Sequence, residues 1–250
     1  MEEKGYFVID RYFDGLLCTA LEDYQGGIVM PVDKPYGWTS ADVVRKIKFL
    51  AQKYFHRKNI KVGHAGTLDP LATGLLLVCI GKATKVAERL QGEKKEYIAK
   101  IRLGATTPSF DLEKEVDATY PFEHITLEMV KEKLGMLVGK QMQVPPLFSA
   151  KYVDGVRAYE KARAGEEVEL KAAEITIYQI EAAAFELPDL TVRISCSKGT
   201  YVRALARDIG VMLGSGAHLT GLVRSASGGF RLENALSMEQ VSRIFKNNQQ

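Results

Sequence analysis

The stretch KVGHAGTLDPLATGLLL, residues 61–77, joins a polar segment to an apolar run of strand length. One histidine, His64, and one aspartate, Asp69, interrupt residues that are otherwise mostly small or apolar. Because aspartate is a favoured N-cap and proline is favoured at the next position, Asp69 followed by Pro70 would by itself predict a helix start. That interpretation leaves unexplained His64 and the small residues around it, which are Gly63, Ala65, Gly66 and Thr67. Small residues allow backbone to approach a bulky ligand, so a functional loop is the alternative.

The segments on either side of this stretch show clear hydrophobic periods. The stretch GGIVMPVDKPYGWTS, residues 26–40, indicates a short buried strand that is ended by Pro35 and Gly37. Residues 40–55 have a helical period after Thr39 or Ser40 as a possible N-cap, and the other face of this helix is basic. Residues 94–107 alternate as a strand with one wet, basic face.

The second half of the chain alternates between predicted helices and strands. Helices are expected over residues 127–137, over 202–213 with Gly214 as C-cap, and after Ser237, where Gln240 occupies the capping-box position. Strands are expected over 174–186 and 190–197, and the acidic segment 109–124 is expected to be an exposed loop. Without a regular βαβ period or an internal repeat, the pattern predicts an α+β fold with a mixed, largely antiparallel central sheet flanked by helices.

Composition bounds the class of protein. The chain has 250 residues, 46% hydrophobic and 26% charged, which suffices for a sizeable core. No apolar run approaches the ~20 residues that span a bilayer, and the acidic start is unlike a signal peptide, so a cytoplasmic protein is expected. Three distant cysteines and four histidines without ligand spacing predict neither disulfides nor a metal site.

Three common catalytic motifs are absent. Gly74 and Gly81 have the wrong spacing for a P-loop, and the glycines that follow Gly214 do not follow a strand, as a dinucleotide fingerprint requires. Ser195 and Lys198 have the SxxK spacing of serine acylases, but they lie at the end of a strand rather than the start of a helix.

The net charge of +3 is small, but its distribution is uneven. Residues 45–61 carry seven lysines and arginines, His56 and no acid. This run is either a solvated helix face or a phosphate-binding surface. The candidate contacts to an RNA backbone are Arg45, Lys48, Lys53, Arg57, Lys58 and Lys61.

Six ordered blocks of the sequence resemble one family. The opening stretch, GHAGTLDPLATGLL, is very similar to the signature of TruB-type tRNA pseudouridine synthases, which isomerise the T-loop uridine at tRNA position 55. The resemblance continues, in order, through DKPYGWTS, KEYIAKIRLG, QVPPLFSAKYVDGVRAYEKAR, CSKGTYVRALARDIG and GAHLTGLVRSASGGF. It covers most of residues 26–230 and implies the pseudouridine synthase fold with RNA-gripping loops.

The resemblance implies a set of catalytic residues and no cofactor. Asp69 matches the family nucleophile, and the family allows either attack on C1′ or a glycal route. Arg203 matches the arginine that pairs with this carboxylate, although without the motif it would read as a surface helix residue. Tyr97 matches the tyrosine that stacks on the target base and is placed for proton transfer.

Four further residues match family positions that bind or support the substrate. Tyr201 matches a second tyrosine of the pocket, and Leu222 matches an apolar pocket wall. His64 matches the histidine that fills the space left by the flipped nucleotide, and Lys34 resembles an element that supports the active-site loop. A half-buried strand tyrosine, a core leucine and a hydrogen-bonded turn histidine are the ordinary alternatives.

The expected organisation is an N-terminal extension over residues 1–25 and a catalytic domain over 26–250, with a thumb-like insertion around 141–165. Many bacterial relatives carry a C-terminal PUA domain, and the 20 residues after Phe230 leave no room for one. The expected partner is the T-arm of tRNA, bound by a monomer. A tRNA-binding chaperone without essential turnover, and a pseudouridine synthase that acts on another RNA, are the alternatives.

Overall fold

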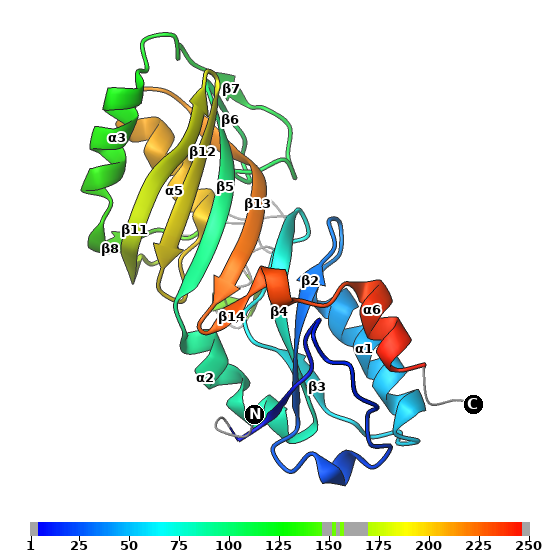
Figure 1. The fold of residues 1–250 in the computed structure, drawn as a ribbon. Helices are drawn as coiled ribbons and strands as arrows, with labels where there is room; N and C mark the ends of the chain where they lie inside the picture. Colours follow the sequence, from blue (N-terminus) through cyan, green and yellow to red (C-terminus); the bar gives the residue numbers. More distant parts are fainter. Residues whose placement is uncertain (1–4, 147–151, 154–155, 158–169, 247–250) are drawn as a thin grey trace. The chain divides into compact units, whose positions relative to one another are not determined.

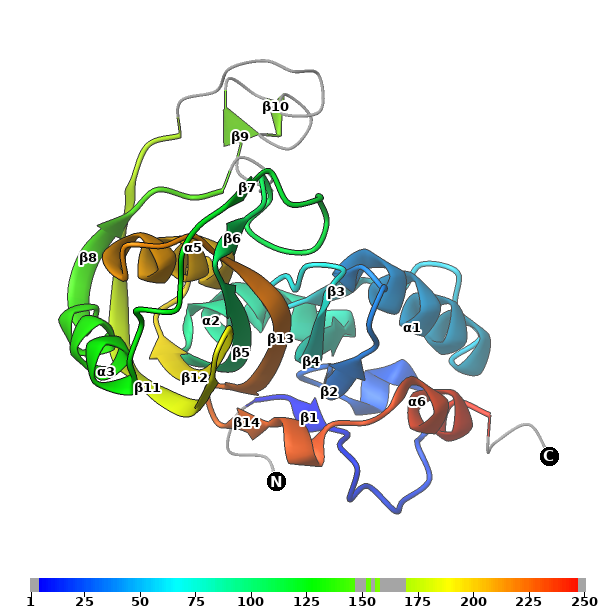
Figure 2. The ribbon, with the colours of Figure 1, turned by 90° about the horizontal axis from the view of Figure 1, so that it is seen from above.

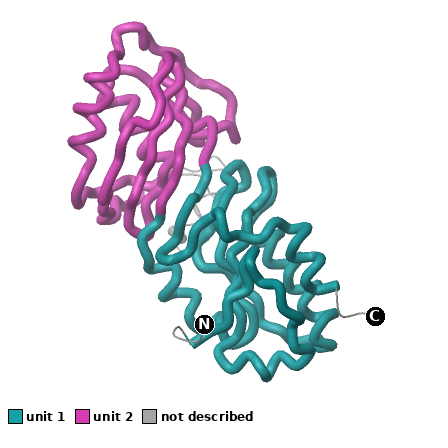
Figure 3. The backbone as a smooth tube through the Cα atoms, viewed as in Figure 1, with its two compact units in different colours: residues 1–95, 223–250 teal, residues 96–222 magenta. Residues whose placement is uncertain are grey.

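The computed structural model describes residues 5–146, 152–153, 156–157 and 170–246. These residues form two compact units (Figure 3). Unit 1 comprises residues 1–95 and 223–250, and unit 2 comprises residues 96–222. Each unit has its own hydrophobic core, and each is described by itself.

Unit 1 is built on the strand that follows the Asp69 loop. This strand, β4 (Ala72–Ile80), pairs antiparallel with β2 (Ile28–Lys34) and with β3 (Val62–His64). The short β1 (Phe7–Val8) pairs parallel with β2. The last part of β13 (Ala217–Ser227) also belongs to unit 1, where it pairs antiparallel with β14 (Phe230–Arg231).

Strand β4 is buried on both faces, which explains its continuous apolar run. Leu76, Val78 and Ile80 contact one cluster, to which α1 (Ser40–Tyr54) and α6 (Met238–Ile244) contribute. Residues between them on β4 contact a second cluster, which includes side chains from the 3₁₀ helix η2 (Gly81–Val86) and from α2 (Ala87–Gly92). Because successive side chains of a strand point to opposite faces, a strand between two layers must be apolar throughout. Helices α1 and α6 lie side by side (Figures 1 and 2).

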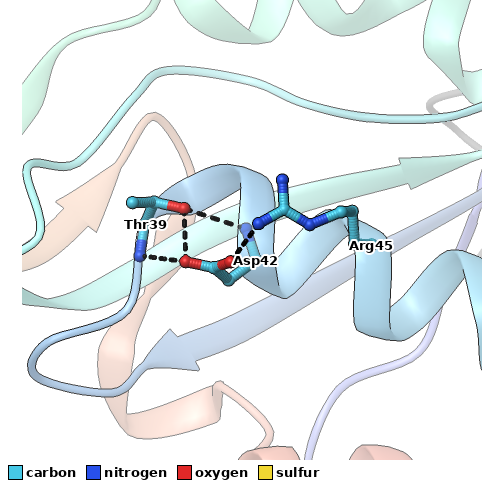
Figure 4. A network of polar contacts seen from close by, with 3 residues as sticks. All are labelled: Thr39, Asp42 and Arg45. Atoms are coloured by element: carbon cyan, nitrogen blue, oxygen red, sulfur yellow. Dashed lines mark hydrogen bonds and ion pairs between the residues drawn. The ribbon is translucent and has the colours of Figure 1, made fainter.

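Helix α1 begins with a complete capping box (Figure 4). The backbone N–H of Thr39 donates to Asp42 Oδ2 at 2.9 Å, and the N–H of Asp42 donates to Thr39 Oγ1 at 3.0 Å. The Asp42 carboxylate also accepts a hydrogen bond from Arg45. The predicted N-cap Thr39 is confirmed, and so is the capping box of Ser237 and Gln240 that opens α6.

In unit 2 the strands of the ten-stranded sheet follow in the order β5 (Lys95–Leu103), β12 (Asp189–Cys196), β11 (Ala173–Glu186) and β8 (Gly139–Gln143). The pairs of β11 with β12 and with β8 are antiparallel. Helices α3 (Leu127–Met136) and α5 (Val202–Met212) share one core cluster with β5, β11 and β12. Two small hairpins are formed by β6 (Ala105–Thr106) with β7 (Ala118–Thr119), and by β9 (Tyr152–Val153) with β10 (Val156–Arg157). Short 3₁₀ turns are η1 (Leu21–Asp23) and η3 (Leu232–Asn234).

The α+β class and the mixed, largely antiparallel sheet are confirmed, and three local predictions are wrong. Asp69 and Pro70 do not open a helix, because β4 begins at Ala72. The helix of the basic run ends at Tyr54, so the run's last cations follow the helix rather than lie on it. The acidic segment is not wholly exposed, since Ser109 and Asp111 are buried. Most of the predicted thumb lies outside the described residues, in 147–151, 154–155 and 158–169.

Candidate active site

The loop that carries Asp69 is fixed through its backbone. Ser40, buried at the start of α1, accepts a hydrogen bond from the N–H of Leu68 at 2.9 Å, and its hydroxyl donates to the Leu68 carbonyl at 3.1 Å. The carbonyl of Pro70 accepts from the N–H of Gly37 at 2.9 Å and from Lys34 Nζ at 3.3 Å. The residues on both sides of Asp69 are therefore tied to the start of α1 and to the segment before it.

Arg224, on the unit 1 part of β13, holds the other end of the loop. Its Nε donates to the Leu75 carbonyl at 2.7 Å, and its two terminal nitrogens donate to the carbonyls of Gly66 at 2.9 Å and Thr67 at 3.3 Å. The side chain is only 1% exposed. A planar guanidinium presents its donors in a fixed fork, so these three bonds set the distance between the loop and the start of β4.

Gly74 allows this close approach. Its φ is +99°, and a Cβ atom there would lie 2.5 Å from the carbonyl oxygen of Arg224. Both the left-handed backbone and the missing space require glycine. Gly74 therefore has a structural role, because it allows β4 to pack directly against the backbone of Arg224.

The Asp69 side chain is half-buried, and its own carbonyl accepts from the N–H of Ala72 at 3.1 Å in a tight turn. Lys34, which is 0% exposed, interacts electrostatically with Asp69. Burial lowers the pKa of Lys34 to about 8, and the negative charge of Asp69 is the largest effect in the opposite direction. The two opposite charges thus attract each other.

His64 lies on β3 at the beginning of the opening stretch, and its ring is partly buried. Burial is the main cause of its lowered pKa, and the charge of Arg224 acts in the same direction. Its Nδ1 is buried and has no hydrogen-bond partner among the described residues. A neutral ring of this kind can stack on a base and can still form a hydrogen bond with a ligand.

In unit 2, Arg203 lies on the first turn of α5 and is 4% exposed. Its Nε is 3.5 Å from Asp111 Oδ2, and one terminal nitrogen donates to the Ser109 carbonyl at 3.2 Å. Asp111 is itself 5% exposed, and its Oδ1 accepts from the N–H of Glu113 at 3.0 Å. The interpretation of Arg203 as a surface helix residue is therefore wrong.

The two tyrosines of the predicted site both lie in unit 2. The backbone of Tyr201 is held by Gln143, whose Oε1 accepts from its N–H at 2.8 Å and whose Nε2 donates to its carbonyl at 3.2 Å. Tyr97 on β5 and Leu222 on β13 are partly buried and pack against the core cluster of unit 2. The ring of each tyrosine is half-buried, which leaves part of it accessible.

The predicted RNA-backbone residues are exposed and all lie in unit 1. Arg45, Lys48 and Lys53 lie on α1, with Phe49 among them at 62% exposure. Arg57, Lys58 and Lys61 follow the helix, and Arg57 forms an ion pair with Glu22.

Asp69, His64 and Lys34 belong to unit 1, where Lys34 interacts electrostatically with Asp69, and Arg203, Tyr201, Tyr97 and Leu222 belong to unit 2. The predicted pairing of Asp69 with Arg203 joins the two units and stays a prediction. Sequence reasoning assigned no role in the site to four residues that hold its backbone or its charges, which are Arg224, Ser40, Asp111 and Gln143. Arg224, Ser40 and Gln143 lie inside quoted motif blocks, which is a signal that could have singled them out, and Asp111 lies in none of these blocks.

No three histidine, cysteine, aspartate or glutamate side chains gather as metal ligands in the part of the chain that the structure describes. In the same part, no helix is long and apolar enough to cross a membrane.

Comparison with known proteins assigns the chain to one family. Residues 52–202 match the model of the TruB family pseudouridylate synthase N-terminal domain, and residues 203–250 match that of the tRNA pseudouridylate synthase B C-terminal domain. A tRNA pseudouridine synthase B from Phocaeicola vulgatus is 58% identical over 87% of this chain and 92% of its own length. The corresponding protein of Thermobifida fusca is 44% identical over 88% of this chain and 75% of its own length.

Solved structures agree with this assignment. A Cbf5-Nop10-Gar1 complex matches with a TM-score of 0.63 and 31% identity, over 88% of this chain and 54% of that chain. An H/ACA RNP bound to a substrate RNA containing 2′-deoxyuridine matches with a TM-score of 0.61 and 29% identity, over 88% and 53%. This chain thus spans about half the length of those two solved chains. The chain belongs to the TruB family of pseudouridylate synthases.

Proposed function

We propose that this protein converts the uridine at position 55, in the T-loop of tRNA, to pseudouridine. As a member of the TruB family it is an isomerase that forms pseudouridine in tRNA. The observation that carries the more specific proposal is the loop around Asp69, in which the flanking backbone is fixed and the carboxylate remains half-exposed. We also propose that the enzyme acts as a monomer in the cytoplasm.

The reaction breaks the bond between N1 of uracil and C1′, turns the base, and joins C5 to C1′. C5 then loses its proton, and N1 gains one, so that the product is an isomer of the substrate. In this proposal the ionised Asp69 carboxylate serves the cleavage, by attack on C1′ or by the glycal route. Tyr97 stacks on the base and is positioned for the proton transfer.

The target base must leave the folded RNA before the carboxylate can reach its sugar. We assign the pocket for the flipped base to Tyr97, Tyr201 and Leu222, and the pairing with the Asp69 carboxylate to Arg203. The partly buried, neutral His64 takes the place that the base leaves. Lys34 keeps the loop in position through its bond to the carbonyl of Pro70.

The exposed face of α1 would hold the RNA backbone. Lys48 and Lys53 supply positive charge, and the exposed ring of Phe49 lies among these cations. Cations interleaved with an aromatic ring are the combination that binds nucleic acids through phosphates and stacked bases. Arg45 contributes less free charge, because Asp42 already pairs with it.

The test is an unmodified tRNA transcript incubated with the protein, followed by mapping of pseudouridine along the RNA. The proposal predicts pseudouridine at position 55 and none in a transcript that carries cytidine there. Modification at another position or in another RNA alone would favour a different substrate. Tight binding of the transcript without any pseudouridine would favour the tRNA-binding chaperone.

A further inference from the structure

A basic hollow of about 370 Å³ lies in unit 1. Three segments line it: the N-terminal segment around Leu21–Asp23, the segment that follows α1, and the 3₁₀ helix η2. Its charged side chains are four cations and one carboxylate, namely Arg57, Lys61, Lys82, Lys85 and Glu22. The hollow therefore carries an excess of three positive charges.

The backbone brings these cations together. The N–H of Gly81 donates to the carbonyl of Lys61 at 2.8 Å, which places Lys61 beside the start of η2. Side chains three residues apart eclipse each other on a 3₁₀ helix, so Lys82 and Lys85 extend on the same side. Within the described part of the chain, none of these three lysines has an ion-pair partner. Like charges held this close repel each other, and a bound anion would relieve the repulsion.

The carboxylate of the hollow does not neutralise this charge, because Glu22 is already paired with Arg57. Tyr24, which also lines the hollow, adds no negative charge. Burial raises its pKa to about 12, and its hydroxyl accepts a hydrogen bond from the N–H of Cys18 at 2.9 Å. The hollow is thus positively charged at neutral pH.

The wall made by the N-terminal segment is tightly fitted. Gly27 has a φ of +77°, and a Cβ atom on it would lie 2.2 Å from the backbone nitrogen of Ala83 in η2. The ring of Tyr24 packs against Phe55, which follows α1, with 6.3 Å between ring centroids. The part of the N-terminal segment from Leu21 to Tyr24 therefore forms one side of this hollow.

We infer that the hollow binds a phosphate group of the tRNA, outside the loop that holds the target uridine. This inference rests on the proposed function. Helix α1 connects the two places: Ser40 at its start bonds to Leu68, next to Asp69, and Arg57 follows its end. Its 15 residues span about 22 Å, at roughly 1.5 Å per residue. An anion that reaches both ends along the basic face of α1 is a nucleic-acid backbone, and the substrate provides one.

The first test is the double variant Lys82→Gln with Lys85→Gln. Its dissociation constant for full-length tRNA should rise about 3- to 10-fold at moderate salt, and the slope of log affinity against log salt should fall by about 1 to 2. The matched control is Lys131→Gln with Lys140→Gln, which removes the same charge from unit 2 and should leave both quantities unchanged. Thermal unfolding of each variant checks that the fold is intact.

The second test predicts a change of tRNA affinity in the opposite direction. Glu22→Gln removes the carboxylate and releases Arg57, so tRNA should bind about 2- to 3-fold more tightly. An exposed ion pair contributes little to stability, so this variant should fold normally. A purely structural role for Glu22 predicts unchanged or weaker binding instead.

Unchanged affinity and salt slope in the double variant would overturn the inference. It would also be wrong if the double variant lost binding of inorganic phosphate but bound tRNA as the wild type does. Formation of pseudouridine by the wild type, measured on the same tRNA, tests the proposed function separately. If the wild type forms pseudouridine but the double variant binds tRNA with unchanged affinity and salt slope, only the inference about this hollow is rejected. The proposed function then stands.

Discussion

Two buried arginines, Arg224 in unit 1 and Arg203 in unit 2, are held in different ways. Arg224 donates to three backbone carbonyls of the Asp69 loop and β4, whereas Arg203 lies 3.5 Å from the carboxylate of Asp111. Carbonyls satisfy the donors of a guanidinium but do not cancel its charge. In unit 2 a neighbouring carboxylate offsets the buried charge.

The difference shows how buried cations of unit 1 position the loop that carries Asp69. Lys34 repeats the arrangement of Arg224, because its Nζ donates to the carbonyls of Pro35, Trp38 and Pro70. Both cations fix loop backbone, and Lys34 also attracts the Asp69 carboxylate. Lys34 thus supplies both positioning and electrostatic attraction.

The largest expected effect comes from Arg224→Ala. It removes hydrogen bonds from the buried carbonyls of Gly66 and Leu75 and from that of Thr67, and it leaves a cavity, so the free energy of unfolding should fall by about 3–5 kcal/mol. Denaturant unfolding measures this change. The free energy of unfolding of Arg224→Lys should lie between those of the wild type and Arg224→Ala, because lysine keeps the charge but lacks the forked donors of the guanidinium. An unchanged unfolding midpoint in Arg224→Ala would show that the three bonds do not hold the loop.

The corresponding change in unit 2 is Asp111→Asn. It leaves Arg203 buried without the carboxylate at 3.5 Å, and the free energy of unfolding should fall by about 2–4 kcal/mol. Asp189→Asn is the matched control, since its pair with Arg102 is about half exposed and should contribute at most about 1 kcal/mol. Equal losses in the two variants would contradict the role assigned to Asp111.

The buried ammonium of Lys34 predicts a specific pH dependence. Its pKa is about 8 in the folded protein against 10.5 for an ordinary lysine, so between these values the unfolded chain binds more protons than the folded one. The free energy of unfolding of the wild type should therefore rise relative to Lys34→Met between pH 8 and 10.5, by up to about 3 kcal/mol, and the difference should be constant below pH 8. A flat difference across the whole range would mean that Lys34 titrates normally.

The smallest effect is expected for Ser40→Ala. The variant removes the hydroxyl that bonds both the N–H and the carbonyl of Leu68, which should cost about 1–2 kcal/mol of unfolding free energy. Because Leu68 precedes Asp69, the loss of turnover, expressed as an activation free energy, should exceed the loss of unfolding free energy. Full turnover in this variant would show that the loop does not depend on Ser40.

Local patterns in the sequence were enough to predict many of the elements. The alternation after Lys94 predicts β5, and the capping pair Ser237 and Gln240 predicts the start of α6. The helix start predicted from the capping preferences of Asp69 and Pro70 was wrong, because the apolar run that follows is a strand buried on both faces.

The site was only partly predictable. Motif blocks single out Asp69, Tyr97 and Arg203, but the supports of the loop depend on contacts between distant parts of the chain. Arg224 reaches carbonyls about 150 residues away, and no local period marks such a contact. Asp111 was hidden in a segment whose acidic composition indicates exposure.

The most direct test of the central claim is turnover of Asp69→Asn on an unmodified tRNA transcript, with binding measured in parallel. The variant keeps the shape of the side chain and loses its charge, so pseudouridine formation should fall at least about 1,000-fold. The affinity for tRNA should stay close to that of the wild type, and Asp14→Asn, which changes an exposed carboxylate of unit 1, should leave both unchanged. Pseudouridine formation by Asp69→Asn at a rate near that of the wild type would contradict the account.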